Sequence, residues 1–130
     1  MTSRSPTSAE PGPRRHGVAA SFGYAFAGLT AAWRTQRNLR IHAVLGLGVV
    51  AAGFLLRIAP LGWGIIALAI GLVVAAELFN TALESVVDLV SPQDHQLAKR
   101  AKDVAAAGVL IAALAAAAAG GAVLFGVLAR

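Results

Sequence analysis

Polar side chains recur at helical spacing between residues 77 and 88. They are the acids Glu77, Glu84 and Asp88, the amide Asn80 and the hydroxyl Thr81. Because an α-helix advances by about 100° per residue, these side chains fall within an arc about 100° wide. The acidic stripe, as we call these residues, directly follows an uncharged stretch at residues 58–76. Acids at the end of a membrane helix repel one another unless a cation lies against them. The pattern therefore favours a metal site, best suited to a metal carrying phosphate, and an enzyme at a membrane surface.

The position of each acid suggests its chemistry. Glu77 lies at the hydrocarbon boundary, where partial desolvation suits a general base that takes a proton from a hydroxyl group. Glu84 lies two turns further along, in a wetter place, and suits a metal ion. Lys102 and Arg100 supply positive charge. The chain contains neither a Gly-x-x-x-x-Gly-Lys-Ser/Thr loop nor a Gly-x-Gly-x-x-Gly fingerprint, so side chains and metal would have to hold the phosphates of a phosphoryl-transfer reaction.

The composition is that of an integral membrane protein. The chain has 130 residues, of which 58% are hydrophobic and 13% charged, and a soluble domain of this size could not bury so much apolar surface. Residues 41–56, 58–76 and 104–129 contain no Asp, Glu, Lys or Arg, and roughly 20 apolar residues cross a bilayer. We therefore predict an all-α integral membrane fold with three transmembrane helices, at about residues 41–59, 61–90 and 104–129. Pro60 separates the first two.

The N-terminal part is expected to lie outside the bilayer. Residues 1–16 are rich in Ser, Pro and Arg and are typical of a disordered cytoplasmic tail. Residues 18–34 mix aromatic residues with Ala and Gly, which predicts an amphipathic surface helix with Tyr24 and Trp33 at the depth of the headgroups. Residues 17–130 are expected to form a single membrane domain.

The basic residues predict the orientation. Every Lys and Arg except Arg57 and Arg130 either precedes the first span or lies between the second and third. The positive-inside bias therefore places the N-terminus and residues 91–103 in the cytoplasm, as in a multi-pass protein of the bacterial inner (plasma) membrane. Topology and anionic lipid headgroups explain the net charge of +5 better than nucleic acid does. The absence of cysteine excludes disulfides and thiolate catalysis.

Other residues have simpler interpretations. His42 and His95 are expected to cap helices or to anchor the chain at the interface rather than to act in catalysis. Gly46, Gly48 and Gly53 of the first span are expected to be packing notches.

The acidic stripe is one of several segments with a resemblance to a known family. Glu77-x-x-Asn80-Thr81-Ala-Leu-Glu84-x-x-Val-Asp88 resembles the signature of the prokaryotic diacylglycerol kinase family, which are small membrane kinases with three helices. Further segments resemble parts of the family in the same order: Ser21-Phe-x-Tyr24-Ala, Arg37-Asn38-x-Arg40-Ile-His42, and His95-x-Leu-Ala-Lys99-x-Ala-Lys102-Asp103-Val-Ala-Ala. The resemblance covers about residues 20–115. The second and third of these segments look closer to the branch that phosphorylates undecaprenol.

The resemblance implies roles for individual residues. Glu77 matches the general base that takes the proton from the lipid hydroxyl, and Glu84 matches a ligand of the Mg²⁺ ion that accompanies ATP. The residues that match the nucleotide-binding part of the site are Asn80, Asp88, Lys102 and Asp103. Arg40 and Thr81 would line the same site. The family fold implied is a homotrimeric helical bundle with active sites near the membrane face.

One position departs from the family pattern. Many members have a glutamate before Arg-Asn as a second metal ligand, and this chain has Gln36 there. An amide oxygen can still coordinate Mg²⁺ or contact the nucleotide, but it brings no charge. Gln36 is therefore expected to belong to the metal and nucleotide site with a weaker hold on the ion.

Functions of different classes fit these observations. The one we expect is an ATP-dependent lipid kinase that phosphorylates a membrane lipid alcohol, undecaprenol or diacylglycerol, at the cytoplasmic face. A small oligomeric transporter with Glu77 as a proton-coupled site is the first alternative, but it leaves Glu84, Lys102 and Asp103 unexplained. A catalytically degenerate membrane scaffold is the second, and Gln36 is the only feature in its favour.

Overall fold

The structure is a computed structural model, and it describes residues 17–129. Within this range the chain forms helices α1 (Val18–Thr35), α2 (Arg37–Leu55), α3 (Pro60–Val90) and α4 (Gln96–Leu128), and it contains no strand. The all-α prediction is confirmed. The tail expected at residues 1–16 lies outside the described residues.

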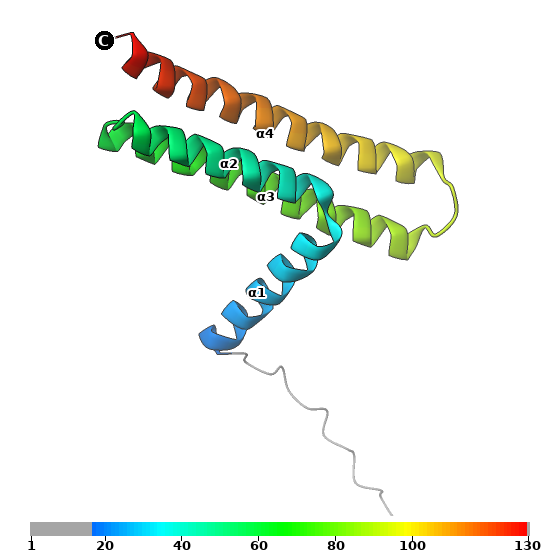
Figure 1. Ribbon diagram of the computed structural model, residues 1–130. Coiled ribbons are helices and arrows are strands. Elements are labelled where there is room, and N and C mark those ends of the chain that lie inside the picture. Colours follow the sequence, from blue (N-terminus) through cyan, green and yellow to red (C-terminus); the bar gives the residue numbers. More distant parts are fainter. Residues whose placement is uncertain (1–16, 130) are drawn as a thin grey trace, which may run out of the picture.

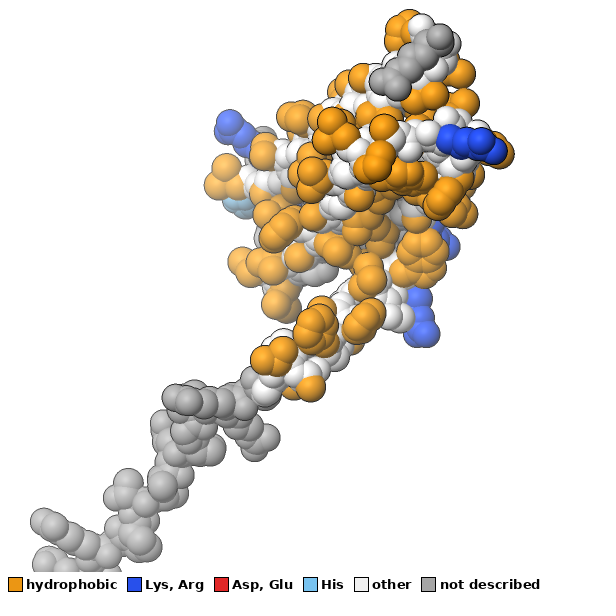
Figure 2. Space-filling model, turned by 90° about the vertical axis from the view of Figure 1, so that its left-hand side faces the viewer, with side chains coloured by type: hydrophobic (Ala, Val, Ile, Leu, Met, Phe, Trp, Pro, Cys, Tyr) orange, Lys and Arg blue, Asp and Glu red, His pale blue; other side chains and the backbone are white. Residues whose placement is uncertain are grey.

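Helices α2, α3 and α4 are each long and apolar enough to cross a membrane, as the uncharged stretches predicted, and α1 is not among them. Large apolar side chains on these helices remain exposed in the single chain, including those of Val44, Leu68 and Phe125. Figure 2 shows hydrophobic side chains over most of the face that it presents. Such a surface suits lipid or neighbouring helices better than water.

The three long helices lie side by side and alternate in direction (Figure 1). The turn between α2 and α3 and the end of α4 share one end of the bundle, and the connection between α3 and α4 lies at the other. Helix α3 has 31 residues, about 45 Å at a rise of 1.5 Å per residue, so it is longer than a hydrocarbon core of roughly 30 Å is thick. Helix α1 leaves the bundle at an angle where α2 begins (Figure 1).

Backbone hydrogen bonds close the turn between α2 and α3. The Ile58 N–H donates to the Gly53 carbonyl at 3.2 Å and the Arg57 N–H donates to the Phe54 carbonyl at 3.2 Å, which are both bonds of a Schellman motif. Arg57 has a φ of 52°, the left-handed conformation that glycine usually supplies at this position. Pro60 then begins α3, where its missing N–H leaves no helical bond unmade.

At the other end of α3, the connection to α4 ends in a side-chain cap. The Leu97 N–H donates to His95 Nδ1 at 3.1 Å, which satisfies one of the free N–H groups in the first turn of α4. The expectation that His95 caps a helix is confirmed.

Glycines allow close approach at some positions of the bundle and not at others. A Cβ on Gly53 would lie 3.0 Å from the Trp63 ring, and one on Gly46 would lie 3.5 Å from Ile70. The prediction of packing notches is confirmed at these two positions. It is wrong for Gly48 within this chain, because a Cβ there would have no neighbour within 4 Å.

The tightest of these approaches lies between α3 and α4 and yields a prediction. A Cβ on Gly62 would lie 2.9 Å from Val123 Cγ1, whereas one on Gly64 would meet nothing within 4 Å. We expect Gly62→Val to destabilise the protein by about 1–3 kcal/mol through overpacking and Gly64→Val to change stability much less. Thermal unfolding in a mild detergent measures both. Equal losses in the two variants would contradict the assigned packing of α3 on α4.

Candidate active site

The acidic stripe runs along α3 from the interior of the bundle to its open end. Glu77 is 2% exposed and Asn80 is 8% exposed. Thr81 and Glu84 are half-buried, and Asp88 is exposed. The Thr81 hydroxyl donates to the Glu77 backbone carbonyl at 2.8 Å, so the hydroxyl has its hydrogen-bond partner within the helix. The exposure of the side chains therefore increases along the stripe, from the buried carboxylate of Glu77 to the exposed carboxylate of Asp88.

Glu84 is held by two amides. Asn80 Nδ2 donates to Glu84 Oε1 at 3.1 Å, and Gln36 Nε2 donates to Glu84 Oε2 at 3.5 Å. Gln36 is the residue at which α1 ends and α2 begins, and its extended backbone interrupts the helix. The break between α1 and α2 therefore brings Gln36 to the acidic stripe, where the sequence placed it.

Two buried oxygens of the stripe have no hydrogen-bond donor among the described residues. They are Glu77 Oε1 and Asn80 Oδ1. His42 Nε2 lies 3.3 Å from Glu77 Oε1, which is within ion-pair distance, but the groups are not aligned for a hydrogen bond. Buried polar atoms are nearly always satisfied in native proteins, so two such oxygens on successive turns of one helix point to a ligand that supplies the donor or cation.

The position of His42 corrects an expectation. The sequence predicted that it would cap a helix or anchor at the interface. Capping is wrong, because His42 lies within α2 and its ring faces Glu77, and the interface position stays a prediction. Its spacing could have revealed this, because Leu39, Gly46 and Gly53 are the buried residues of α2. His42 lies three residues after Leu39 and four before Gly46, which puts it on the same inward face.

Two ion pairs lie at the outer end of the site, one between α3 and α4 and one on the surface of α4. Lys102 Nζ donates to Asp88 Oδ1 and so links α4 to α3. Lys99 Nζ donates to Asp103 Oδ2 at 2.7 Å, along the surface of α4. Asp88, Lys99 and Lys102 line an open hollow of about 510 Å³ beside the connection between the two helices. The charges needed for a nucleotide therefore lie next to the stripe.

Two predicted site residues do not contact Glu84 or the two amides that hold it. Asp103 is exposed, and among residues 17–129 its hydrogen-bond partner is Lys99. Arg40 is exposed on α2, and no hydrogen bond or ion pair joins its side chain to another described residue. Both lie on helices that contribute to the site.

A magnesium ion requires oxygen donors, and several lie on or beside the acidic stripe. Among residues 17–129, no group of three or more His, Asp or Glu side chains forms a metal cluster. The oxygen donors are the Glu84 carboxylate, the unpartnered Asn80 Oδ1 and the amide oxygen of Gln36. Mg²⁺ commonly takes one or two carboxylates and completes its shell with water and substrate phosphates. These residues therefore fit an ion that arrives with a nucleotide.

The chain matches known proteins over most of its length. Residues 23–124 match the family described as prokaryotic diacylglycerol kinase. This chain belongs to that family. The resemblance of the acidic stripe and its companion segments is therefore confirmed.

Relatives carry two enzyme names. The chain is 51% identical over 105 residues to a diacylglycerol kinase of Synechocystis, covering 80% of this chain and 60% of that protein. It is 43% identical over 94 residues to the undecaprenol kinase of Bacillus subtilis, covering 72% and 76%. It is 36% identical over 90 residues to the diacylglycerol kinase of Escherichia coli, covering 69% and 74%. All three names denote lipid kinases.

The arrangement around Glu84 predicts how the metal requirement responds to charge. We expect Gln36→Glu to lower the Mg²⁺ concentration that gives half the maximal rate of lipid phosphorylation, because a second carboxylate strengthens the attraction for the ion. We expect Glu84→Gln to be close to inactive, because only neutral ligands would then remain to bind the metal ion. A Mg²⁺ titration of the initial rate at fixed ATP compares these variants with the wild type. An unmoved curve for Gln36→Glu, or full activity in Glu84→Gln, would place the metal elsewhere.

Proposed function

We propose that this protein is an ATP-dependent lipid kinase that transfers the γ-phosphoryl group of ATP to the hydroxyl of a membrane lipid alcohol. One observation carries the proposal: Glu77 Oε1 and Asn80 Oδ1 are buried without donors, two turns and one turn from the amide-held carboxylate of Glu84. A hydroxyl and a metal-bound phosphate are the groups that such an arrangement accepts. Family membership supports this chemistry and gives no support to a transporter or a scaffold.

In this proposal Glu77 is the general base. Its Oε1 accepts the proton of the lipid hydroxyl as the hydroxyl oxygen attacks the γ-phosphorus. Because Glu77 is 2% exposed, water competes poorly with the lipid hydroxyl at this position, which limits hydrolysis of ATP. Asn80, one turn further along α3, orients the reacting groups.

The lipid would approach Asn80 from the side of the membrane. An open groove of about 710 Å³ lies between α3 and α4, and its lining is apolar apart from Asn80. Phe79, Leu83 and Val109 are among its apolar residues. Such a groove accepts a hydrocarbon chain by burial of apolar surface, so undecaprenol and diacylglycerol are both acceptors in this proposal.

The nucleotide would bind at the outer end of the stripe. Magnesium bound by Glu84 and Gln36 would neutralise charge on the phosphates. Lys102 would exchange its contact with Asp88 for a phosphate oxygen, and Asp103 would be released from Lys99 to order the nucleotide. Arg40 and Thr81 would line the approach to this site.

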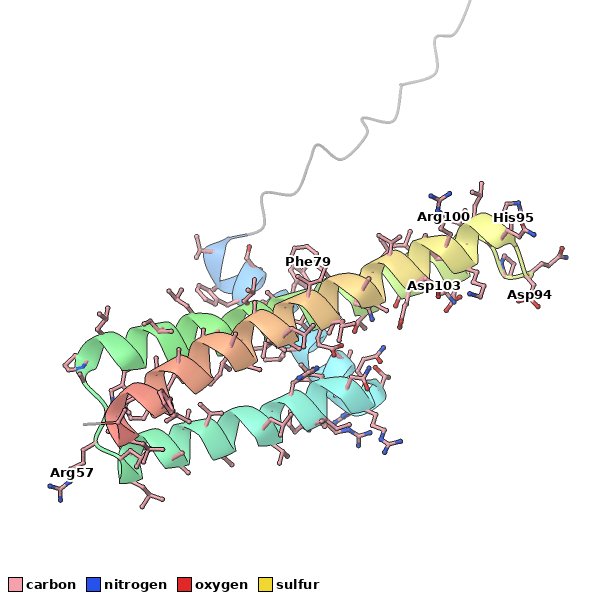
Figure 3. The ribbon with its side chains drawn as sticks, turned by 90° about the horizontal axis from the view of Figure 1, so that it is seen from above. Arg57, Phe79, Asp94, His95, Arg100 and Asp103 are labelled. Atoms are coloured by element: carbon pink, nitrogen blue, oxygen red, sulfur yellow. The ribbon has the colours of Figure 1, made fainter. Side chains whose placement is uncertain are left out.

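The orientation proposed places this chemistry in the cytoplasm, on the inner face of a bacterial plasma membrane. Arg100, Asp94 and His95 lie at one end of the bundle and Arg57 lies at the other (Figure 3). The basic residues at the start of α2 and of α4 precede their apolar stretches, as the positive-inside bias requires. Residues 17–130 would then form a single kinase domain, with α1 on the cytoplasmic leaflet.

The proposed function is tested with the base itself. Purified wild-type protein with Mg²⁺ and labelled ATP should phosphorylate undecaprenol, diacylglycerol or both. Glu77→Gln should lower the rate by a factor on the order of 10² to 10⁴, because an amide of the same shape cannot accept the proton. Arg57→Gln removes an exposed charge at the other end of the bundle and serves as the control, with an expected rate near that of the wild type. Labelling of neither lipid by the wild type would refute the kinase function, and a nearly normal Glu77→Gln would remove Glu77 from the role of base.

We also propose that the protein acts as a homotrimer. A Cβ on Gly71 of α3 or on Gly121 of α4 would meet nothing within 4 Å in this chain, so these small residues leave room for the helices of another copy. Native mass spectrometry in a mild detergent should detect trimers. Gly121→Leu should shift the distribution towards smaller species, whereas detection of monomers alone in the wild type would refute the proposal.

A further inference from the structure

The surroundings of Glu77 restrict where a proton on it can go. The carboxyl group is 2% exposed, and the ionisable groups that act on it are His42 of α2 and Glu84 of its own helix. The same region of α2 borders a cavity of about 300 Å³ between α2, α3 and α4. The α4 residues that line it, including Ala113 and Ala116, cannot ionise. The nearby α1 residues Leu29 and Trp33 likewise carry no ionisable group.

A general base must also lose the proton that it has taken before it can act again. If Glu77 is the base, as the proposed kinase function requires, its protonated form is almost fully buried. His42 Nε2 lies 3.3 Å from Glu77 Oε1, the oxygen without a hydrogen-bond donor. The His42 side chain is 23% exposed and that of Glu77 is 2% exposed, so His42 is the more accessible member of this pair.

We propose that His42 is the proton exit of this site. In the chemical step the lipid O–H bond breaks, the lipid oxygen bonds to the γ-phosphorus, ADP leaves, and the proton passes to Glu77 Oε1. Glu77 then gives this proton to Nε2 of neutral His42, and the imidazolium releases a proton from its other nitrogen to water. Glu77 is then a carboxylate again, and His42 is a neutral imidazole with its proton on Nε2. Proton exchange with water restores the Nδ1–H tautomer before the next turnover, and the net product is one proton in solution. An imidazole suits this role because its two nitrogens can bind and release protons on opposite sides of the ring.

His42→Gln and His42→Leu test this role. Glutamine can place an amide near the position of Nε2 and form a hydrogen bond with Glu77, but it cannot carry the proton. We therefore expect kcat for lipid phosphorylation to fall on the order of tenfold or more in both variants. The KM values for ATP and lipid should stay within about twofold of the wild-type values, because neither variant alters a group that binds substrate. The ratio of kcat in H₂O to kcat in D₂O should rise in His42→Gln, because proton release then limits turnover.

Val49→Ala is the matched control for packing. Val49 lies on the same helix and lines the same cavity, two turns from His42, and its truncation should leave kcat and the isotope ratio unchanged. Wild-type kcat in His42→Gln would overturn the proton-exit role, because a hydrogen bond alone would then suffice. An unchanged isotope ratio, or an equal loss of kcat in Val49→Ala, would overturn it as well. Wild-type protein that labels neither lipid would instead refute the kinase function itself.

Discussion

The burial of Glu77 within a membrane-length helix is the constraint on which the rest of this structure depends. An ionisable side chain at membrane depth is costly unless nearby groups interact with it. Here α2 supplies the His42 ring at 3.3 Å, and α3 supplies Asn80 one turn away. The three helices must therefore keep their register along their axes, because a shift of one turn would separate Glu77 from His42. Close contacts such as Gly62 against Val123 and Gly53 against Trp63 provide that register by shape.

The lengths of the helices then divide the site into two environments. Helices α3 and α4 extend beyond the thickness of a hydrocarbon core, so one stripe on one helix carries both a buried and a solvated carboxylate. The break at Gln36 ends α1 and turns the chain into α2 beside this outer part. In the proposed function a lipid hydroxyl would come from the apolar groove and a nucleotide from the polar hollow, which adjoin at Val87.

The same division explains how relatives with different names can share this framework. In the proposed function, the chemistry at the stripe would concern a hydroxyl group, a phosphate and a metal, and these are the same for any lipid alcohol. The rest of the lipid contacts apolar side chains, whose interaction depends on buried area more than on chemical detail. Differences in acceptor between a diacylglycerol kinase and an undecaprenol kinase can therefore arise in the groove while the polar residues stay in place.

The sequence by itself determined the three apolar helices, the face shared by Glu77 and Glu84, and the family. These follow from periodicity and composition, which depend on neighbours along a single helix. Only the tertiary structure decided that His42 faces Glu77, that Lys102 pairs with Asp88, and that Gly48 has open space while Gly46 does not. The physical reason is that lipid accepts any apolar helix face as readily as another helix does, so hydrophobicity cannot tell which face packs against which. That choice depends on the fit of small residues against large ones and on polar contacts between helices far apart in the chain.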